Sequence, residues 1–309
     1  NDKDNLHWRL KYNQESRGDV YATHGLGPVA QCMDIHRGDR FTTLVAMDTE
    51  SFFGKDFVEK KTGKECKDFR NGDHTTTLMR TAKGKVVEIQ HNVMTPQPYN
   101  RLFKLTGTKG YATKYPTPEY ALSGEAMKGT GAPKIDNLNA HGFMNAEQKA
   151  ALEKKYYHPI LTKYGELGRE MGHGGMDYIM EARLVYCLQN GLPLDMDVYD
   201  MAEWCSLAEL GAISMDNNCA AVTFPDFTRG YWNMQQGYKH AYAPAEEEAK
   251  TEAAADAYTA AQKKVTADFN LWALYDAIKT AKNPKSAQKK YNAAVVKAEK
   301  AMAKALAKK

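Results

Sequence analysis

The 309-residue sequence lacks several features that mark simple function classes. No apolar run approaches the roughly 20 residues that a membrane-spanning helix needs. The five cysteines are widely spaced, odd in number and form no C-x-x-C pair, which argues against a zinc site or a disulfide framework. The residues before Ala245 carry 29 of the 42 Lys+Arg and 30 of the 38 Asp+Glu, so the main body is nearly neutral. We therefore expect a globular protein with no membrane span and no nucleic-acid partner.

One glycine pattern raises the question of a dinucleotide site. The stretch "GLGPVA" at 25–30 fits G-x-G-x-x-A, and Asp48 follows about 20 residues later, where a ribose-binding acid is expected. A dinucleotide fold also needs a preceding buried strand and a long crossover helix. Here only "DVYAT" precedes the turn, and hairpins follow it. We therefore reject a dinucleotide site at this turn.

The first half of the body has the pattern of an antiparallel sheet. An alternating, β-branched run covers 41–50, a hairpin surrounds "AKG" at 82–84, and another strand pair surrounds "GTKG" at 107–110. Consecutive strands with tight turns over 19–115 favour an antiparallel arrangement. Helical periodicity begins at Asn145, a candidate N-cap. The predicted fold class is α+β: an open, mostly antiparallel sheet covered on one face by helices.

The last 65 residues differ from the rest, being rich in Ala, Lys and Glu. The "NPKS" sequence at 283–286 predicts a break between two helices. We expect a 1–244 α+β domain for substrate binding and oligomerisation, followed by a helical hairpin at 245–309. We interpret the charged side of this hairpin as a solvent-exposed face, as is usual for charged, Ala-rich helices. The alternative is that the hairpin is a basic surface or an oligomerisation element.

A few polar residues are candidates for chemistry. His24 lies between Tyr21 and Gly25, a pattern that holds an imidazole on exposed backbone. His173 has glycines on both sides and precedes a helix N-terminus, where polar ligand groups bind easily. Asp177, in the first turn of that helix, either binds substrate or only offsets the helix dipole. We interpret a further acidic group as helix-capping and predict no metal site; it comprises Asp195, Asp197 and Asp200.

Longer motifs carry a family resemblance. They are "RGDVYATHGLGPVAQCMDIHRGDRF", "TPQPYN", "GTKGYA", "GHGGMDYIMEARLVYCLQNGLPLDMDVYD" and "PDFTRGYW". Together they resemble the C-terminal substrate domain of glycoside hydrolase family 109, the NAD-dependent α-N-acetylgalactosaminidase-like enzymes of the Gfo/Idh/MocA superfamily. The resemblance runs from about Trp8 to Trp232 and excludes the Ala/Lys-rich end.

The resemblance implies an NAD-dependent exo-glycosidase acting on terminal sugars such as α-linked N-acetylgalactosamine. By the family's motif, Tyr21 and His24 correspond to substrate-contacting positions, Tyr99 is a weaker match to another sugar-facing tyrosine, and the implied chemistry makes His24 a proton-transfer group. From the residues alone, we add His173 as a second catalytic candidate and Asp177 as a substrate-binding candidate. NAD would be bound mainly by a Rossmann domain absent from this chain, so this chain alone is expected to be inactive. The family also suggests a homo-oligomer formed through the sheet and a periplasmic or secreted bacterial location.

Two other functions stay open on the sequence. The first is a sugar oxidoreductase of the same superfamily, because related folds support different chemistries. The second is a carbohydrate-binding or assembly protein without a cofactor domain.

Overall fold

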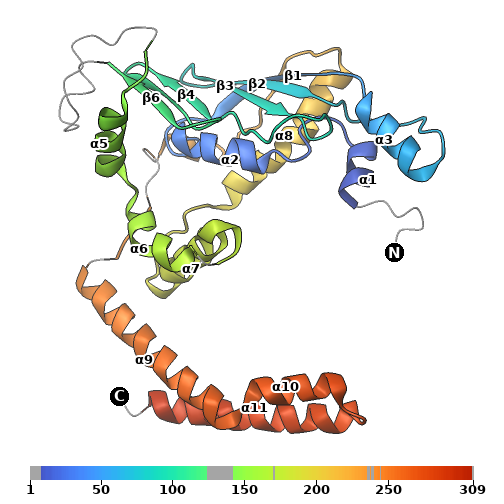
Figure 1. Cartoon of the computed structure of the whole chain (residues 1–309). Helices are drawn as coiled ribbons and strands as arrows, with labels where there is room; N and C mark the ends of the chain where they lie inside the picture. Colours follow the sequence, from blue (N-terminus) through green and yellow to red (C-terminus); the bar gives the residue numbers. More distant parts are fainter. Residues whose placement is uncertain are drawn as a thin grey trace. The chain divides into compact units, whose positions relative to one another are not determined.

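The computed structural model describes residues 8–123, 142–169, 171–234, 237, 240–243 and 245–307 (Figure 1). Contacts between residues divide the chain into two compact units. Unit 1 comprises Asn1–Ile179 and Asp195–His240, and unit 2 comprises Met180–Leu194 and Ala241–Lys309. None of the described helices is long and apolar enough to cross a membrane.

A four-stranded antiparallel sheet forms the centre of unit 1, in the order β3-β2-β1-β7. Its strands are β1 (Phe41–Asp48), β2 (Thr75–Thr81), β3 (Val86–His91) and β7 (Val222–Thr223). Alternate side chains point to opposite faces of a strand. On one face Leu44, Met79 and Ile89 are buried, while Met47 and Leu78 on the other are exposed.

Two helices cover the buried face of this sheet, α2 (Thr23–Cys32) and α8 (Val198–Asp216) (Figure 1). Leu26 of α2 and Leu207 of α8 are fully buried in the same core. Gly27 of α2 lies against the Trp204 ring of α8, and a Cβ at Gly27 would be in van der Waals contact with that ring, at 3.4 Å. The helix that carries His24 is therefore fixed to the sheet by packing.

A second sheet has the order β4-β5-β6: β4 (Lys104–Gly107), β5 (Gly110–Thr113) and β6 (Glu119–Leu122). Helix α5 (Ala146–Tyr156) contributes Leu152 to a small core with Tyr120 of β6. Asn145 caps α5, and its side chain accepts a hydrogen bond from the backbone N–H of Gln148. The predicted N-cap is thus confirmed.

Shorter elements complete unit 1. They are α1 (Trp8–Glu15), α3 (Phe53–Thr62), α6 (Pro159–Gly168) and the 3₁₀ turns η1 (Gly172–Gly175) and η2 (Tyr231–Asn233). Helix α7 (Met176–Gln189) begins in unit 1 and continues in unit 2.

The α+β class and both predicted hairpins are confirmed, with two local differences. The "DVYAT" segment, expected before the glycine turn as a strand, is a turn that leads into α2, so Gly25 and Gly27 lie within a helix. The region after β1, within the 19–115 segment expected to consist of consecutive strands and turns, contains helix α3, which ends at the left-handed Gly63. Helices α2 and α3 each bury one apolar side against the rest of unit 1. Tertiary packing of this kind stabilises helices in short segments, and the period-2 pattern used to predict strands does not reveal it.

Unit 2 contains α9 (Ala245–Phe269), α10 (Leu271–Thr280) and α11 (Pro284–Leu306). The break predicted at "NPKS" is confirmed, since Asn283 caps α11 and Pro284 is its first residue. A second break occurs at Asn270, whose φ of 44° ends α9. The extension therefore has three helices where the sequence suggested two.

Candidate functional site

Tyr21 and His24 lie against each other at the start of α2. Their rings are stacked, with centroids 4.6 Å apart and planes 24° apart. Both side chains are exposed, and Thr23 Oγ1 lies 3.4 Å from His24 Nδ1. The pair thus offers a phenol and an imidazole to solvent from one turn of backbone.

Two arginines act on this pair, and one of them also contacts a second tyrosine. The guanidinium of Arg9, on α1, lies over the Tyr21 ring, 5.4 Å from its centroid. The side chain of Arg101 donates a hydrogen bond to the Tyr99 hydroxyl. Arg9 and Arg101 are both close enough to His24 to act on it electrostatically. We call Arg9, Tyr21, His24, Tyr99 and Arg101 the His24 site.

The charges of the site favour a neutral imidazole. Partial burial lowers the pKa of His24, and the positive charges of Arg101 and Arg9 lower it further. A neutral imidazole can accept a proton from a nearby hydroxyl group, whereas a protonated one can only donate. The lowered pKa therefore favours a neutral His24 imidazole near neutral pH.

Buried polar contacts anchor the turn before Tyr21. The backbone N–H of Gly18 donates to Asn71 Oδ1 at 2.9 Å, and Asn71, fully buried, donates in turn to Asn13. Gly18 has a φ of 101°, where a side chain would be strained. The carboxylate of Asp19 accepts a hydrogen bond from the backbone N–H of Tyr21, and burial raises the pKa of Asp19 to about 6.

Asp48, the acid expected to bind a ribose in a dinucleotide fold, takes part in this anchoring instead. It accepts two hydrogen bonds from Arg17, at 2.8 and 2.9 Å. Gly25 and Gly27 face protein on the inner side of α2, against Ile89 and Trp204. The arrangement agrees with our rejection of a dinucleotide site at "GLGPVA".

His173 and Asp177 form a separate pair. His173 Nδ1 lies 2.7 Å from Asp177 Oδ2, both side chains are exposed, and the hydrogen bond with Asp177 raises the pKa of His173. His173 has a φ of 53°, followed by the left-handed Gly174, so the glycine-rich turn does present the imidazole to solvent. Among the described residues, no contact joins this pair to the His24 site.

A buried ion network lies at the N-terminus of α8. His36 Nε2 lies 2.6 Å from Glu203 Oε2, and His36 Nδ1 lies 3.8 Å from Asp200 Oδ1. Arg37 donates two hydrogen bonds to Asp200, at 2.9 and 2.8 Å. Burial opposes the charge of His36, but the neighbouring carboxylates of Asp200 and Glu203 outweigh it and raise the pKa of His36 to about 9.

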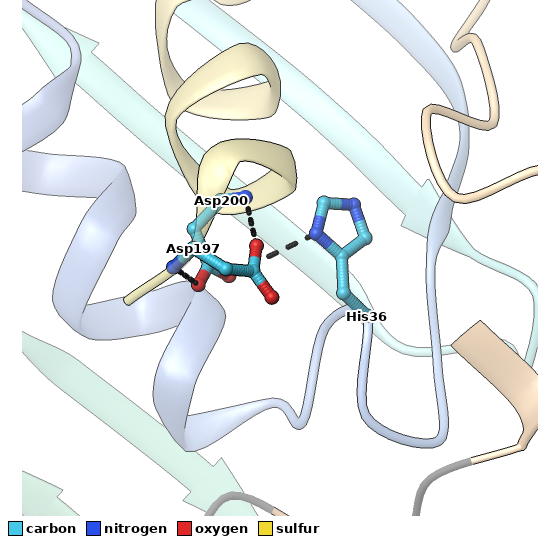
Figure 2. A group of neighbouring side chains, drawn as sticks. All are labelled: His36, Asp197 and Asp200. Carbon is cyan, nitrogen blue, oxygen red and sulfur yellow. Dashed lines mark hydrogen bonds and ion pairs between the residues drawn. The ribbon is translucent and has the colours of Figure 1, made fainter. Parts of the chain in front are cut away.

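The same network contains three groups with potential metal-ligand atoms, His36, Asp197 and Asp200, all within 4.8 Å of one another (Figure 2). Figure 2 shows that the two aspartates already cap the helix: Asp197 accepts from the backbone N–H of Asp200, and Asp200 from that of Asp197. Arg37 and protonated His36 supply the positive charge that a cation would bring. The capping interpretation holds for these two acids. Asp195 lies outside the cap, 3.1 Å from His240.

Sequence reasoning missed Arg9, Arg101 and His36. Arg101 follows Tyr99 by two residues in "PYNR", and this spacing was the one sequence signal that could have identified Arg101 as a site residue. Arg9 is 12 residues before Tyr21, on a helix that brings it back over the ring.

The described α+β domain combines an exposed histidine with two tyrosines and two guanidiniums. These groups can hydrogen-bond to sugar hydroxyls and stack on sugar rings, so they suit a carbohydrate-binding enzyme domain. Residues 1–234 match the family described as glycosyl hydrolase 109, C-terminal domain, and the chain belongs to this family. It is therefore a member of a glycosidase family.

Several curated relatives are similar over long stretches. Glycosyl hydrolase family 109 protein 3 of Phocaeicola vulgatus is 77% identical over 309 residues, which cover 99% of this chain and 56% of the relative. Glycosyl hydrolase family 109 protein 1 of Bacteroides fragilis is 56% identical over 237 residues, or 76% of this chain and 51% of the relative. The family 109 protein of Porphyromonas gingivalis gives the same three percentages. The chain spans about half the length of these relatives.

Proposed function

We propose that the whole protein is an NAD-dependent exo-glycosidase of the Gfo/Idh/MocA superfamily, acting on terminal sugars such as α-linked N-acetylgalactosamine. This chain would be its substrate-binding part. One observation supports the proposal most: the charged groups that act on His24 are Arg9 and Arg101, both cations. Ordinary glycosidases place two carboxylates across the scissile bond. A neutral histidine among tyrosines and arginines suits proton transfer at sugar hydroxyls instead.

Four residues of the His24 site have a role in binding or proton transfer in this proposal. His24 would take and return the proton of a ring hydroxyl, while Tyr21, stacked on it, hydrogen-bonds the same sugar. Tyr99, held by Arg101, would bind a second hydroxyl. NAD, bound mainly by a Rossmann domain outside this chain, would supply reversible oxidation of the ring.

His173 and Asp177 would form a second proton-transfer pair. The hydrogen bond to Asp177 orients the ring and favours the protonated form, so His173 suits an acid, whereas His24 suits a base. Two groups with opposite pKa shifts are the usual division of labour in acid–base catalysis.

We also propose that the protein forms a homo-oligomer through the uncovered face of the four-stranded sheet. That face exposes Met47, Leu78 and Val86, with exposed fractions of 62%, 46% and 63%. Leu78→Lys would place a charge in the centre of such an interface. Sedimentation of the full-length protein should then give a smaller species, and an unchanged mass would remove this part of the proposal.

The test of the main proposal uses the full-length protein and a nitrophenyl α-N-acetylgalactosaminide. His24→Ala should lower kcat about 10²–10⁴-fold, the range expected for loss of a proton-transfer group. The matched control is His91→Gln, because His91 is buried in β3 and should affect the melting temperature more than turnover. Near-native kcat in His24→Ala would refute the site assignment.

Two further measurements separate the alternatives. An oxidised sugar as the product would indicate a sugar oxidoreductase. This 309-residue chain alone should neither retain NAD nor hydrolyse the glycoside. Tight NAD binding by this chain would contradict the expected division between two domains.

A further inference from the structure

The lysines of α11 gather on one side of the helix. At 100° per residue, the six fall within an arc of about 140°. We call this set the lysine face: Lys285, Lys289, Lys290, Lys297, Lys300 and Lys304. Figure 1 shows α11 as one continuous helix beside α10, so the lysine face is a straight stripe. From Lys285 to Lys304 the stripe is about 29 Å long, at 1.5 Å per residue.

The opposite side of α11 is the one that packs. Ala298 is buried, Val295 is half-buried, and the Tyr291 ring lies 5.7 Å from that of Tyr275 on α10. The stripe of Tyr291, Val295, Ala298 and Met302 is centred about 170° from the centre of the lysine face, by the same helical geometry. Packing within unit 2 therefore leaves the lysines outward.

The lysine face is not neutralised within the described part of the chain. All six lysines are exposed, and none of them forms an ion pair with a described acidic group. On α10, by contrast, Lys279 lies 3.0 Å from Asp276. Helix α11 has a single acidic residue, Glu299. Pairs such as Lys285 with Lys289 are one turn apart and repel each other, so an outside anion would relieve unfavourable charge.

The composition of the face limits the class of anion. The face has no arginine, which would bind single phosphates in a bidentate manner, and no aromatic ring on which a nucleobase could stack. Both features disfavour a nucleic acid as the ligand. Its one large apolar residue is Val296, too little for an amphipathic helix to insert into a lipid surface. Lysines are compact point charges on flexible stems, suited to a regularly charged linear polymer without fixed geometry.

We propose that the lysine face is a docking surface for an acidic polysaccharide. The choice of a glycan over other polyanions rests on the proposed function, because a glycosidase gains effective concentration when a second site holds the polymer that carries its substrate. Helix α11, which carries the face, lies beyond residue 234, where the family match ends. The match to Glycosyl hydrolase family 109 protein 3 of Phocaeicola vulgatus includes this helix. The surface is thus an addition to the family domain.

The test measures binding of fluorescent chondroitin sulfate, a linear sulfated polysaccharide, to the 309-residue chain and to the full-length protein. The charge-removed variant combines Lys289→Gln, Lys297→Gln, Lys300→Gln and Lys304→Gln. The matched control combines glutamine substitutions at four exposed lysines of unit 1: Lys60, Lys61, Lys64 and Lys67. Of these, Lys60 pairs with Asp56 and Lys67 with Glu65. Both variants lose four charges, and circular dichroism checks that both fold.

The charge-removed variant should bind at least tenfold more weakly, while the control binds like the wild type. Raising salt from 50 to 200 mM should weaken wild-type binding at least tenfold, as counterion release requires. Equal loss in both variants would overturn the proposal, as would equal or stronger binding to DNA, to polyglutamate or to phosphatidylserine vesicles. Binding is measured without turnover, so its failure is distinct from a failure of the proposed glycosidase activity.

Discussion

Replacement of His36 by asparagine should remove a pH-dependent part of the stability of unit 1. His36 has a φ of 65°, a left-handed conformation that asparagine tolerates better than most residues. The substitution therefore removes the imidazole with little added backbone strain. Glu203, only 1% exposed, loses its charged partner.

The magnitude follows from the raised pKa. A folded-state pKa of about 9 against an unfolded value of 6.5 corresponds to about 3 kcal/mol of stabilisation by protonated His36. This agrees with the roughly 3–5 kcal/mol lost when one partner of a buried ion pair is removed. Because the pKa is raised in the folded state, the stabilisation is complete below pH 6.5 and is lost as the pH rises through 9. Between pH 7 and pH 9 it should fall by about 2 kcal/mol.

The assay is urea unfolding of wild-type protein and His36→Asn at pH 6, 7, 8 and 9, followed by circular dichroism and tryptophan fluorescence. The difference in unfolding free energy isolates the contribution of His36, since other titrating groups are common to both proteins. A histidine NMR titration provides a direct check: the pKa of His36 should be near 9, and Glu203→Gln should lower it. A difference below about 1 kcal/mol at pH 6, or one that stays constant up to pH 9, would refute the buried ion network.

Three further predictions concern other parts of unit 1. Burial and the nearby positive charge of His74 lower the pKa of His91 to about 4. The stability difference between wild type and His91→Gln should therefore fall as the pH drops from 6.5 to 4, whereas the difference for His36 falls as the pH rises. Urea unfolding between pH 4 and pH 6.5 checks this. Asn71→Ala leaves the buried N–H of Gly18 unpaired and should cost about 1–3 kcal/mol, measured by urea unfolding at pH 7. Asp197→Ala removes the N-cap of α8 and should cost about 1 kcal/mol, visible as a lower urea midpoint with an unchanged slope.

The sequence determined the features that depend on neighbouring residues. The hairpin around "AKG" followed from two β-branched runs and a glycine, here Gly84 with a φ of 82°. Asn145 as a cap and the break before Pro284 followed from local backbone chemistry. The longest motifs, such as "YATHGLGP", placed the chain in its family. The proximity of His24 and Tyr21 could be predicted from the sequence because the two residues are only three positions apart.

Only the tertiary structure decided which distant groups meet. Arg9 and Arg101 act on His24 from α1 and from the segment before β4, and no periodicity in the sequence relates these three positions. His36 finds Glu203 across 167 positions because α8 packs on the sheet beside α2. Such contacts arise because each helix and strand buries its apolar face in a common core. The hydrophobic effect that drives this burial has no direction, so local sequence does not specify which polar groups it brings together. Local sequence sets where helices and strands form, while packing of the whole domain sets the charges that surround each histidine.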